Sequence, residues 1–159
     1  MNSIRLAVAA AIALGSSVAV LPAISTAIAP SVALPDTVVV DVAGGDDMSC
    51  VVLSDGTAFC SGQNGEGELG NGVEGPDEPS PTQVLGIDDA IEVESWDEFS
   101  CVRSAIGQVS CWGDNASGQT GNGTTTGDDP FPGPVVDLPL ADAVTTGNET
   151  GCALVSGAV

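Results

Sequence analysis

Hydrophobic residues in this chain come in short runs that alternate with turn-forming residues, and no helical spacing follows residue 35. Val-rich segments such as "TVVVDVA" and "AIEVES" are separated by "SDGT" and "GQNGEGELGNG". Short apolar runs punctuated by Gly, Asn, Asp and Pro predict antiparallel hairpins. Pro79 and Pro81, matched by Pro130 and Pro132, predict a loop that recurs. The pattern therefore predicts an all-β fold.

The pattern returns after 51 residues. When residues 42–92 are placed on residues 93–143 without a gap, 18 of the 51 positions are identical, and a third copy begins in residues 144–159. Each copy has room for four short strands. Repeats of this length made only of strands predict propeller blades. The expected fold class is an incomplete β-propeller of four-stranded antiparallel repeats, following an N-terminal signal helix.

The N-terminal segment has the features of a secretory signal peptide. A single cation precedes an apolar run from Leu6 to Leu21, which is broken by Pro22. Because proline interrupts the helix that a membrane anchor needs, we expect this segment to be removed and the protein to be secreted or held at the cell surface. Membrane association follows only if the segment is retained. The predicted divisions are a signal peptide at 1–27, a linker at 28–38 and the repeats at 39–159.

Composition excludes several classes of function. The chain carries a formal net charge of −20, with 22 acids against two cations, and it has no histidine and no tyrosine. Lysine is also absent, so no imidazole base, lysine nucleophile or phosphate-loop lysine can be built. An acidic surface repels the phosphates of nucleic acids. We therefore expect neither an enzyme nor a nucleic-acid-binding protein.

Four cysteines form two pairs ten positions apart, Cys50 with Cys60 and Cys101 with Cys111. If the glycine within each pair takes the left-handed position of a three-residue hairpin loop, the two cysteines face each other across the strands. In a secreted chain each disulfide would stabilise the fold by about 3 kcal/mol in the chain-entropy model. A zinc site or free thiols are the alternatives, although zinc sites usually have closer spacing and no histidine is available.

Cys152 is left unpaired by this scheme. The repeat places its partner beyond Val159, so we expect this sequence to be the front of a longer one. A free reactive thiol is the alternative. An unclosed propeller exposes blade faces and strand edges. This predicts a protein partner, or self-association, through the open edges.

These residues resemble a known family. The segment "CVRSAIGQVSCWGDNASGQTGNG" is similar to the repeat of the regulator of chromosome condensation family in its bacterial secreted form, where a Cys-flanked hairpin leads into Trp-Gly-x-Asn. In the first copy Ser61 replaces the tryptophan and Glu68 the glutamine. The resemblance covers residues 39–159 and implies blades of a seven-bladed propeller. It also implies that Trp112 is packed, whereas Trp96 has no counterpart and is expected to be exposed.

Members of this family use the propeller as a binding platform, so the resemblance implies a binding protein. Because one fold serves many tasks, the fold alone does not choose the partner. We expect a secreted, non-catalytic module that binds protein or acts as a scaffold. One alternative is a regulator of a small GTPase that resembles a guanine-nucleotide exchange factor. Another is a propeller that binds or hydrolyses carbohydrate, for which Trp96 could stack on a sugar.

Pairs of acids recur just before the first cysteine of each copy, as Asp46-Asp47 and Asp97-Glu98. Equivalent positions in successive blades face the same way, so Asp46, Asp47, Asp97 and Glu98 would form an arc of carboxylates. Such an arc suits calcium or a basic partner. The alternative is that these acids are solvated loop residues that keep the protein soluble.

Overall fold

The structure is a computed structural model, and it describes residues 37–157. The predicted signal peptide at 1–27, with its signal helix, and most of the predicted linker lie outside the described residues. The described residues form strands, turns and bends, and no helix. Accordingly, this part of the chain contains no helix long and apolar enough to cross a membrane.

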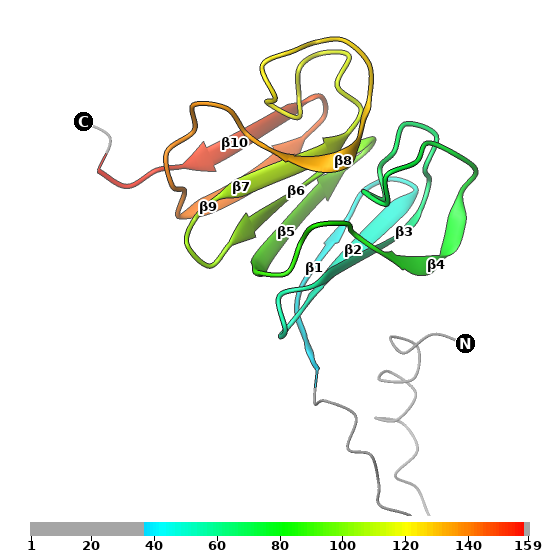
Figure 1. The fold of residues 1–159 in the computed structure, drawn as a ribbon, viewed down its shortest axis with the longest axis horizontal. Coiled ribbons are helices and arrows are strands. Elements are labelled where there is room, and N and C mark those ends of the chain that lie inside the picture. Colours follow the sequence, from blue (N-terminus) through cyan, green and yellow to red (C-terminus); the bar gives the residue numbers. More distant parts are fainter. Residues whose placement is uncertain (1–36, 158–159) are drawn as a thin grey trace, which may run out of the picture. The chain divides into compact units, whose positions relative to one another are not determined.

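Ten strands form two four-stranded sheets and one hairpin (Figure 1). In each sheet the strands lie side by side in chain order, and all the pairs are antiparallel. The prediction of an all-β chain with four-stranded antiparallel repeats is confirmed. The first sheet contains β1 (Val39–Gly44), β2 (Met48–Leu53), β3 (Ala58–Gly62) and β4 (Glu78–Gln83); the second contains β5 (Ala90–Trp96), β6 (Phe99–Ser104), β7 (Val109–Gly113) and β8 (Asp129–Pro134); the hairpin contains β9 (Ala143–Gly147) and β10 (Thr150–Leu154).

The central hairpin of each sheet is closed by a disulfide. Cys50 lies opposite Cys60 in the β2–β3 register, and Cys101 lies opposite Cys111 in the β6–β7 register. The sulfurs are 2.05 Å apart in the first pair and 2.12 Å apart in the second. Gly56 makes the first turn with a φ of 85°, a conformation that favours glycine. The structure thus joins the cysteines that the hairpin pattern placed opposite each other.

The recurring prolines lie in strands, so the prediction of a loop at these positions is wrong. Pro79 and Pro81 belong to β4, and Pro130 and Pro132 belong to β8. These are the last strands of their sheets, and the β3–β4 pairing shifts register midway. Proline cannot donate a backbone hydrogen bond, but an edge strand needs donors on one side only. The outermost position of the sheet therefore tolerates a proline-rich strand.

The larger apolar core lies between the two sheets. It combines buried side chains of the first sheet with Val93, Val102 and Trp112 of the second. The indole of Trp112 is fully buried, and its N–H donates to the Glu68 carbonyl oxygen at 2.7 Å. The Val93 N–H donates to the Asp41 carboxylate at 2.9 Å. The two sheets therefore pack as neighbouring blades, held by apolar burial and by hydrogen bonds between the sheets.

The two tryptophans offer a matched test of this packing. Trp112→Ala is expected to lower the free energy of unfolding by about 3–5 kcal/mol, because removing a large aromatic side chain from a packed core leaves a cavity. Trp96 is 48% exposed, and Trp96→Ala is expected to cost less than about 0.5 kcal/mol. Urea unfolding of the oxidised protein, followed by circular dichroism, measures both. Equal losses for the two variants would contradict the packing role of Trp112.

Candidate functional site

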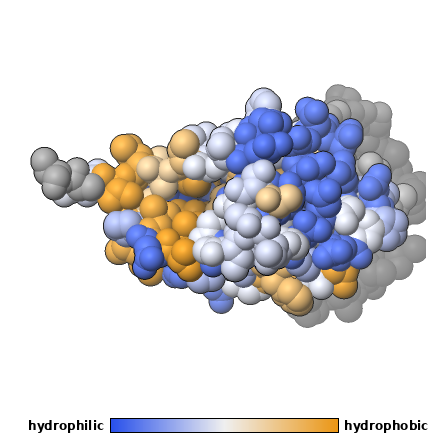
Figure 2. Space-filling view, turned by 90° about the horizontal axis from the view of Figure 1, so that it is seen from above, coloured by the Kyte–Doolittle hydropathy of each residue, from blue (hydrophilic) through white to orange (hydrophobic). Residues whose placement is uncertain are grey.

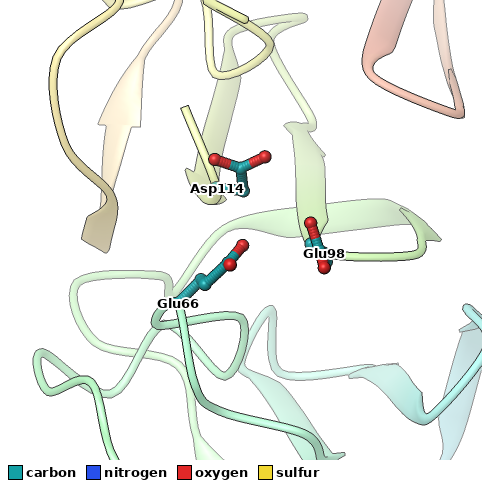
Figure 3. Close-up of side chains that lie close together, drawn as sticks. All are labelled: Glu66, Glu98 and Asp114. Carbon is teal, nitrogen blue, oxygen red and sulfur yellow. The ribbon is translucent and has the colours of Figure 1, made fainter. Parts of the chain in front are cut away.

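Three carboxyl groups meet where the two sheets adjoin. Glu66 comes from the loop between β3 and β4, Glu98 from the turn between β5 and β6, and Asp114 from the residue after β7. The three side chains point toward one another (Figure 3), and one oxygen of each lies within 4.8 Å of the others. All three residues are partly or fully buried. We call these residues the carboxylate cluster.

Hydrogen bonds within the second repeat hold Asp114 in position. One carboxylate oxygen of Asp114 accepts the Ala116 N–H at 2.8 Å, and the other accepts the side-chain amide of Gln119 at 2.6 Å. The carbonyl oxygen of the Gln119 side chain accepts the Ser117 N–H at 2.8 Å. Short polar side chains that bind nearby backbone groups are typical of turns. The loop after β7 thus fixes the Asp114 carboxylate within the cluster.

Glu68 takes in the first repeat the place that Gln119 takes in the second. Its Oε2 accepts the Glu66 N–H at 2.8 Å, as the Gln119 side chain does for Ser117. The other oxygen of Glu68 makes no hydrogen bond with the described residues, although the side chain is fully buried. Burial and the charge of Asp97 raise the pKa of Glu98 most, and the charge of Glu68 adds a smaller rise. The change from glutamine to glutamate therefore adds a fourth acid near the cluster.

Burial and negative charge favour a proton within the cluster. Burial, followed by the charges of Glu98 and Asp114, raises the pKa of Glu66 to about 7. Burial and then the charge of Asp97 raise the pKa of Glu98, while the hydrogen bond that Glu98 accepts from Glu66 lowers it. Below about pH 7, Glu66 therefore favours the protonated form, in which it can donate a hydrogen bond to Glu98.

Of the four residues predicted to bind calcium, the structure brings Glu98 into the carboxylate cluster. Asp46 and Asp47 are exposed in the bend between β1 and β2. Asp97 lies in the turn between β5 and β6, with a φ of 48°. Carboxylate oxygens are the ligands that calcium prefers. Calcium binding stays a prediction, and the structure supplies Glu66 as a further candidate ligand.

Sequence reasoning missed Glu66 and Asp114 because the two acids occupy different positions of the repeat. Glu66 aligns with Ser117, and Asp114 aligns with Gln63. A search for acids that recur at equivalent positions cannot find a site assembled from unequal positions of neighbouring blades. Only the stacking of one blade on the next places the loop after β3 beside the turn between β5 and β6.

An open groove lies between the second sheet and the β9–β10 hairpin. Its volume is about 340 Å³, and both sides contribute to its lining, which includes Val135, Leu138, Val144 and Cys152. The strand β10 pairs with β9 and with no other strand of residues 37–157. Cys152 on this strand is exposed and forms no disulfide. Figure 2 shows hydrophobic residues gathered at this end of the molecule, to the left of the view.

Comparison with known families identifies the segments that contain the disulfide hairpins and the carboxylate cluster. Residues 39–68 and 97–119 match the family described as the regulator of chromosome condensation (RCC1) repeat. These two segments are RCC1 repeats. The two matched segments include both disulfide hairpins and all the residues of the carboxylate cluster. The resemblance drawn from the sequence is confirmed.

Solved structures show the same fold as these RCC1 repeats. Human WBSCR16 is 24% identical, with a TM-score of 0.63, over 70% of this chain and 29% of that one. Prp20p from Saccharomyces cerevisiae is 16% identical, with a TM-score of 0.62, over 72% of this chain and 30% of that one. Yeast RCC1 (Prp20) bound to Kap60 is 17% identical, with a TM-score of 0.59. The chain thus spans less than a third of the length of these proteins.

The cluster makes stability depend on pH through Glu66. The folded-state pKa of about 7 lies above the ordinary value of 4.5, so between these pH values the folded protein holds a proton that the unfolded chain has lost. The free energy of unfolding is therefore expected to fall as the pH rises through this interval. In Glu66→Gln the side chain cannot ionise but can still donate to Glu98, so the fall should be smaller.

Urea unfolding at a series of pH values from about 4.5 to 8 measures this difference. Glu74→Gln removes one charge from an exposed position and serves as the control. Its stability should follow the wild-type pH profile, displaced at most by a constant amount. Parallel profiles for Glu66→Gln and the wild type would contradict the assignment of the proton to Glu66.

Proposed function

We propose that this chain is a secreted, non-catalytic module of RCC1 repeats that binds a protein partner. The observation that carries the proposal is the open groove beside the unpaired edge of β10. Unpaired strand edges are sites where other polypeptides add. The exposed apolar residues near this end include Val136, Leu140 and Leu154.

The solved relatives support a protein as the partner. The Prp20p structure was described together with its binding to Gsp1p and histones, and yeast RCC1 was solved bound to Kap60. In these proteins the same fold therefore serves protein recognition. We extend this role to the present chain as a proposal, because the likeness extends over less than a third of their length.

The proposed lack of catalysis rests on the amino-acid types available. The chain has no histidine and no lysine. Arg103, the only cation among residues 37–157, forms an ion pair with Glu92. The histidine and lysine side chains that many hydrolases and transferases use as a general base or a nucleophile are thus missing from the sequence. A protein that binds without catalysis needs none of these groups.

The proposed secretion rests on two features. The N-terminal residues carry the cation, apolar run and small residues of a signal peptide. The two hairpin disulfides belong to an oxidising compartment, because cytosolic thiols are kept reduced. Both features favour the cell exterior as the place where the protein acts.

Site-specific photocrosslinking in the native host tests partner binding. A benzoylphenylalanine at Leu154, which is 63% exposed on β10, should yield one major protein adduct on irradiation. The same residue at Ile106, which is 66% exposed in the β6–β7 turn, is the control and should yield none. Adducts from both positions, or from neither, would contradict binding at the open edge. Identification of the adduct as a small GTPase would instead support the exchange-factor alternative.

Alkylation of thiols before and after reduction, followed by intact mass measurement, tests secretion. The extracellular protein should lack a segment near residues 1–27, and its four hairpin cysteines should react only after reduction. A protein that keeps Met1 and has five reactive thiols would contradict the assignment to the cell exterior.

A further inference from the structure

The carboxylate cluster has the donor atoms and the spacing of a calcium site. Glu66, Glu98 and Asp114 each place one oxygen within 4.8 Å of the others (Figure 3). Two oxygens on opposite sides of a calcium ion lie about 4.6–5.2 Å apart, because each oxygen lies about 2.3–2.6 Å from the ion. One ion can therefore contact all three side chains. Carboxylate oxygens suit calcium, whereas zinc and copper favour the imidazole and thiolate ligands that the cluster lacks.

Two buried carboxylate oxygens at this place have no partner. Oε2 of Glu66 is buried and accepts no hydrogen bond from the described residues. The same is true of Oε1 of Glu68, whose side chain is completely buried and whose other oxygen accepts the Glu66 N–H. A carboxylate that is buried without a hydrogen bond or an opposite charge is strongly unfavourable. The two oxygens belong to a cluster member and to the residue that holds its backbone, and they therefore indicate a positively charged ligand.

The described part of the chain supplies no cation to the cluster. Arg103, the only cation among residues 37–157, forms an ion pair with Glu92. A proton on Glu66 removes only one of the negative charges. In the second repeat, by contrast, the residue that aligns with Glu68 is Gln119, and its side-chain amide donates to a carboxylate. The positive charge that compensates the acids of the cluster must therefore come from solution.

We propose that Glu66, Glu98 and Asp114 bind one calcium ion between the first and the second repeat. Glu68 adds a negative charge beside the ion, and water completes the coordination shell. Because Glu66 belongs to the loop after β3 and the other two ligands belong to the second repeat, the ion ties the two repeats together. The site shares only Glu98 with the arc of acids expected from the sequence. It is independent of the proposed protein binding.

Calorimetric titration with calcium chloride tests the site directly. The full-length oxidised protein, freed of metal with EGTA and dialysed at fixed ionic strength, should bind one ion with a Kd of about 10⁻⁴–10⁻³ M, the range of extracellular calcium modules. Magnesium should bind about tenfold more weakly or worse, because it gives up its water ligands reluctantly. Absence of saturable calcium binding, or equal affinity for the two ions, would overturn the proposal.

Variants of the cluster locate the ion. Glu98→Gln and Asp114→Asn each remove one charged ligand and should weaken calcium binding by about tenfold or more. Glu98→Gln can still accept a hydrogen bond from Glu66, so it is the variant expected to keep the fold. Asp47→Asn is the matched control, because Asp47 aligns with Glu98 and is exposed, and its Kd should change by less than about twofold. Weakened binding in Asp47→Asn, with Asp114→Asn unchanged, would overturn the placement in favour of the arc of recurring acids.

Glu68→Gln separates the charge of this residue from its part in the fold. Glutamine can accept the Glu66 N–H as Gln119 accepts that of Ser117, so the loop should be retained. Calcium affinity should fall severalfold, whereas the protein in EGTA should be as stable as the wild type or more stable, since a buried charge without a partner is removed. Calorimetry and urea unfolding measure the two effects. Unchanged affinity, or a large loss of stability in EGTA, would overturn the role given to Glu68.

Thermal unfolding distinguishes a bound ion from general screening in a chain with a net charge of −20. Saturating calcium should raise the Tm of the wild type by about 2 °C or more beyond the effect of magnesium at the same ionic strength, because the ion binds the folded protein only. This difference should vanish in Glu98→Gln. Equal shifts in the wild type and in Glu98→Gln would identify an adventitious ion only, acting by screening, and would overturn the proposal.

Discussion

The contact on which the rest of the structure depends is the burial of Trp112 between the two sheets. Its indole takes the space that Gly70 leaves open and satisfies a backbone carbonyl in the same position. The disulfide at Cys111 fixes the register of the strand one residue earlier. Because side chains alternate between the faces of a strand, that register decides whether the indole faces the neighbouring sheet. The β6–β7 hairpin thereby fixes the strand pairing in its own sheet and the packing of the first sheet against it.

The same boundary brings acids together in a protein that already carries a net charge of −20. Bringing Glu66 beside Glu98 would be costly if both were ionised, since like charges repel more strongly when partly buried. The raised pKa of Glu66 relieves this repulsion by turning one carboxylate into a hydrogen-bond donor. Contact between the blades is therefore coupled to a proton.

Much of the fold could be predicted from the sequence because the information is local and repeated. The period of 51 residues, the cysteines ten apart and the glycine turns depend on nearby residues. The burial of Trp112 agrees with what the family resemblance implied, and Trp96 is exposed as expected. Pro79 and its counterparts were misread, because a proline signals a break unless the edge position of the strand is known. That position is a property of the assembled sheet.

By itself, the sequence determined the all-β class, the repeat length, the disulfide pairs and the acidic, histidine-free composition, since each follows from residue type and short spacing. Tertiary structure alone decided the carboxylate cluster, because Glu66 and Asp114 stand at unequal places in their repeats and meet only when one blade stacks on the next. The reason is that a site between two blades needs residues that are neighbours in space, which spacing within one repeat cannot supply.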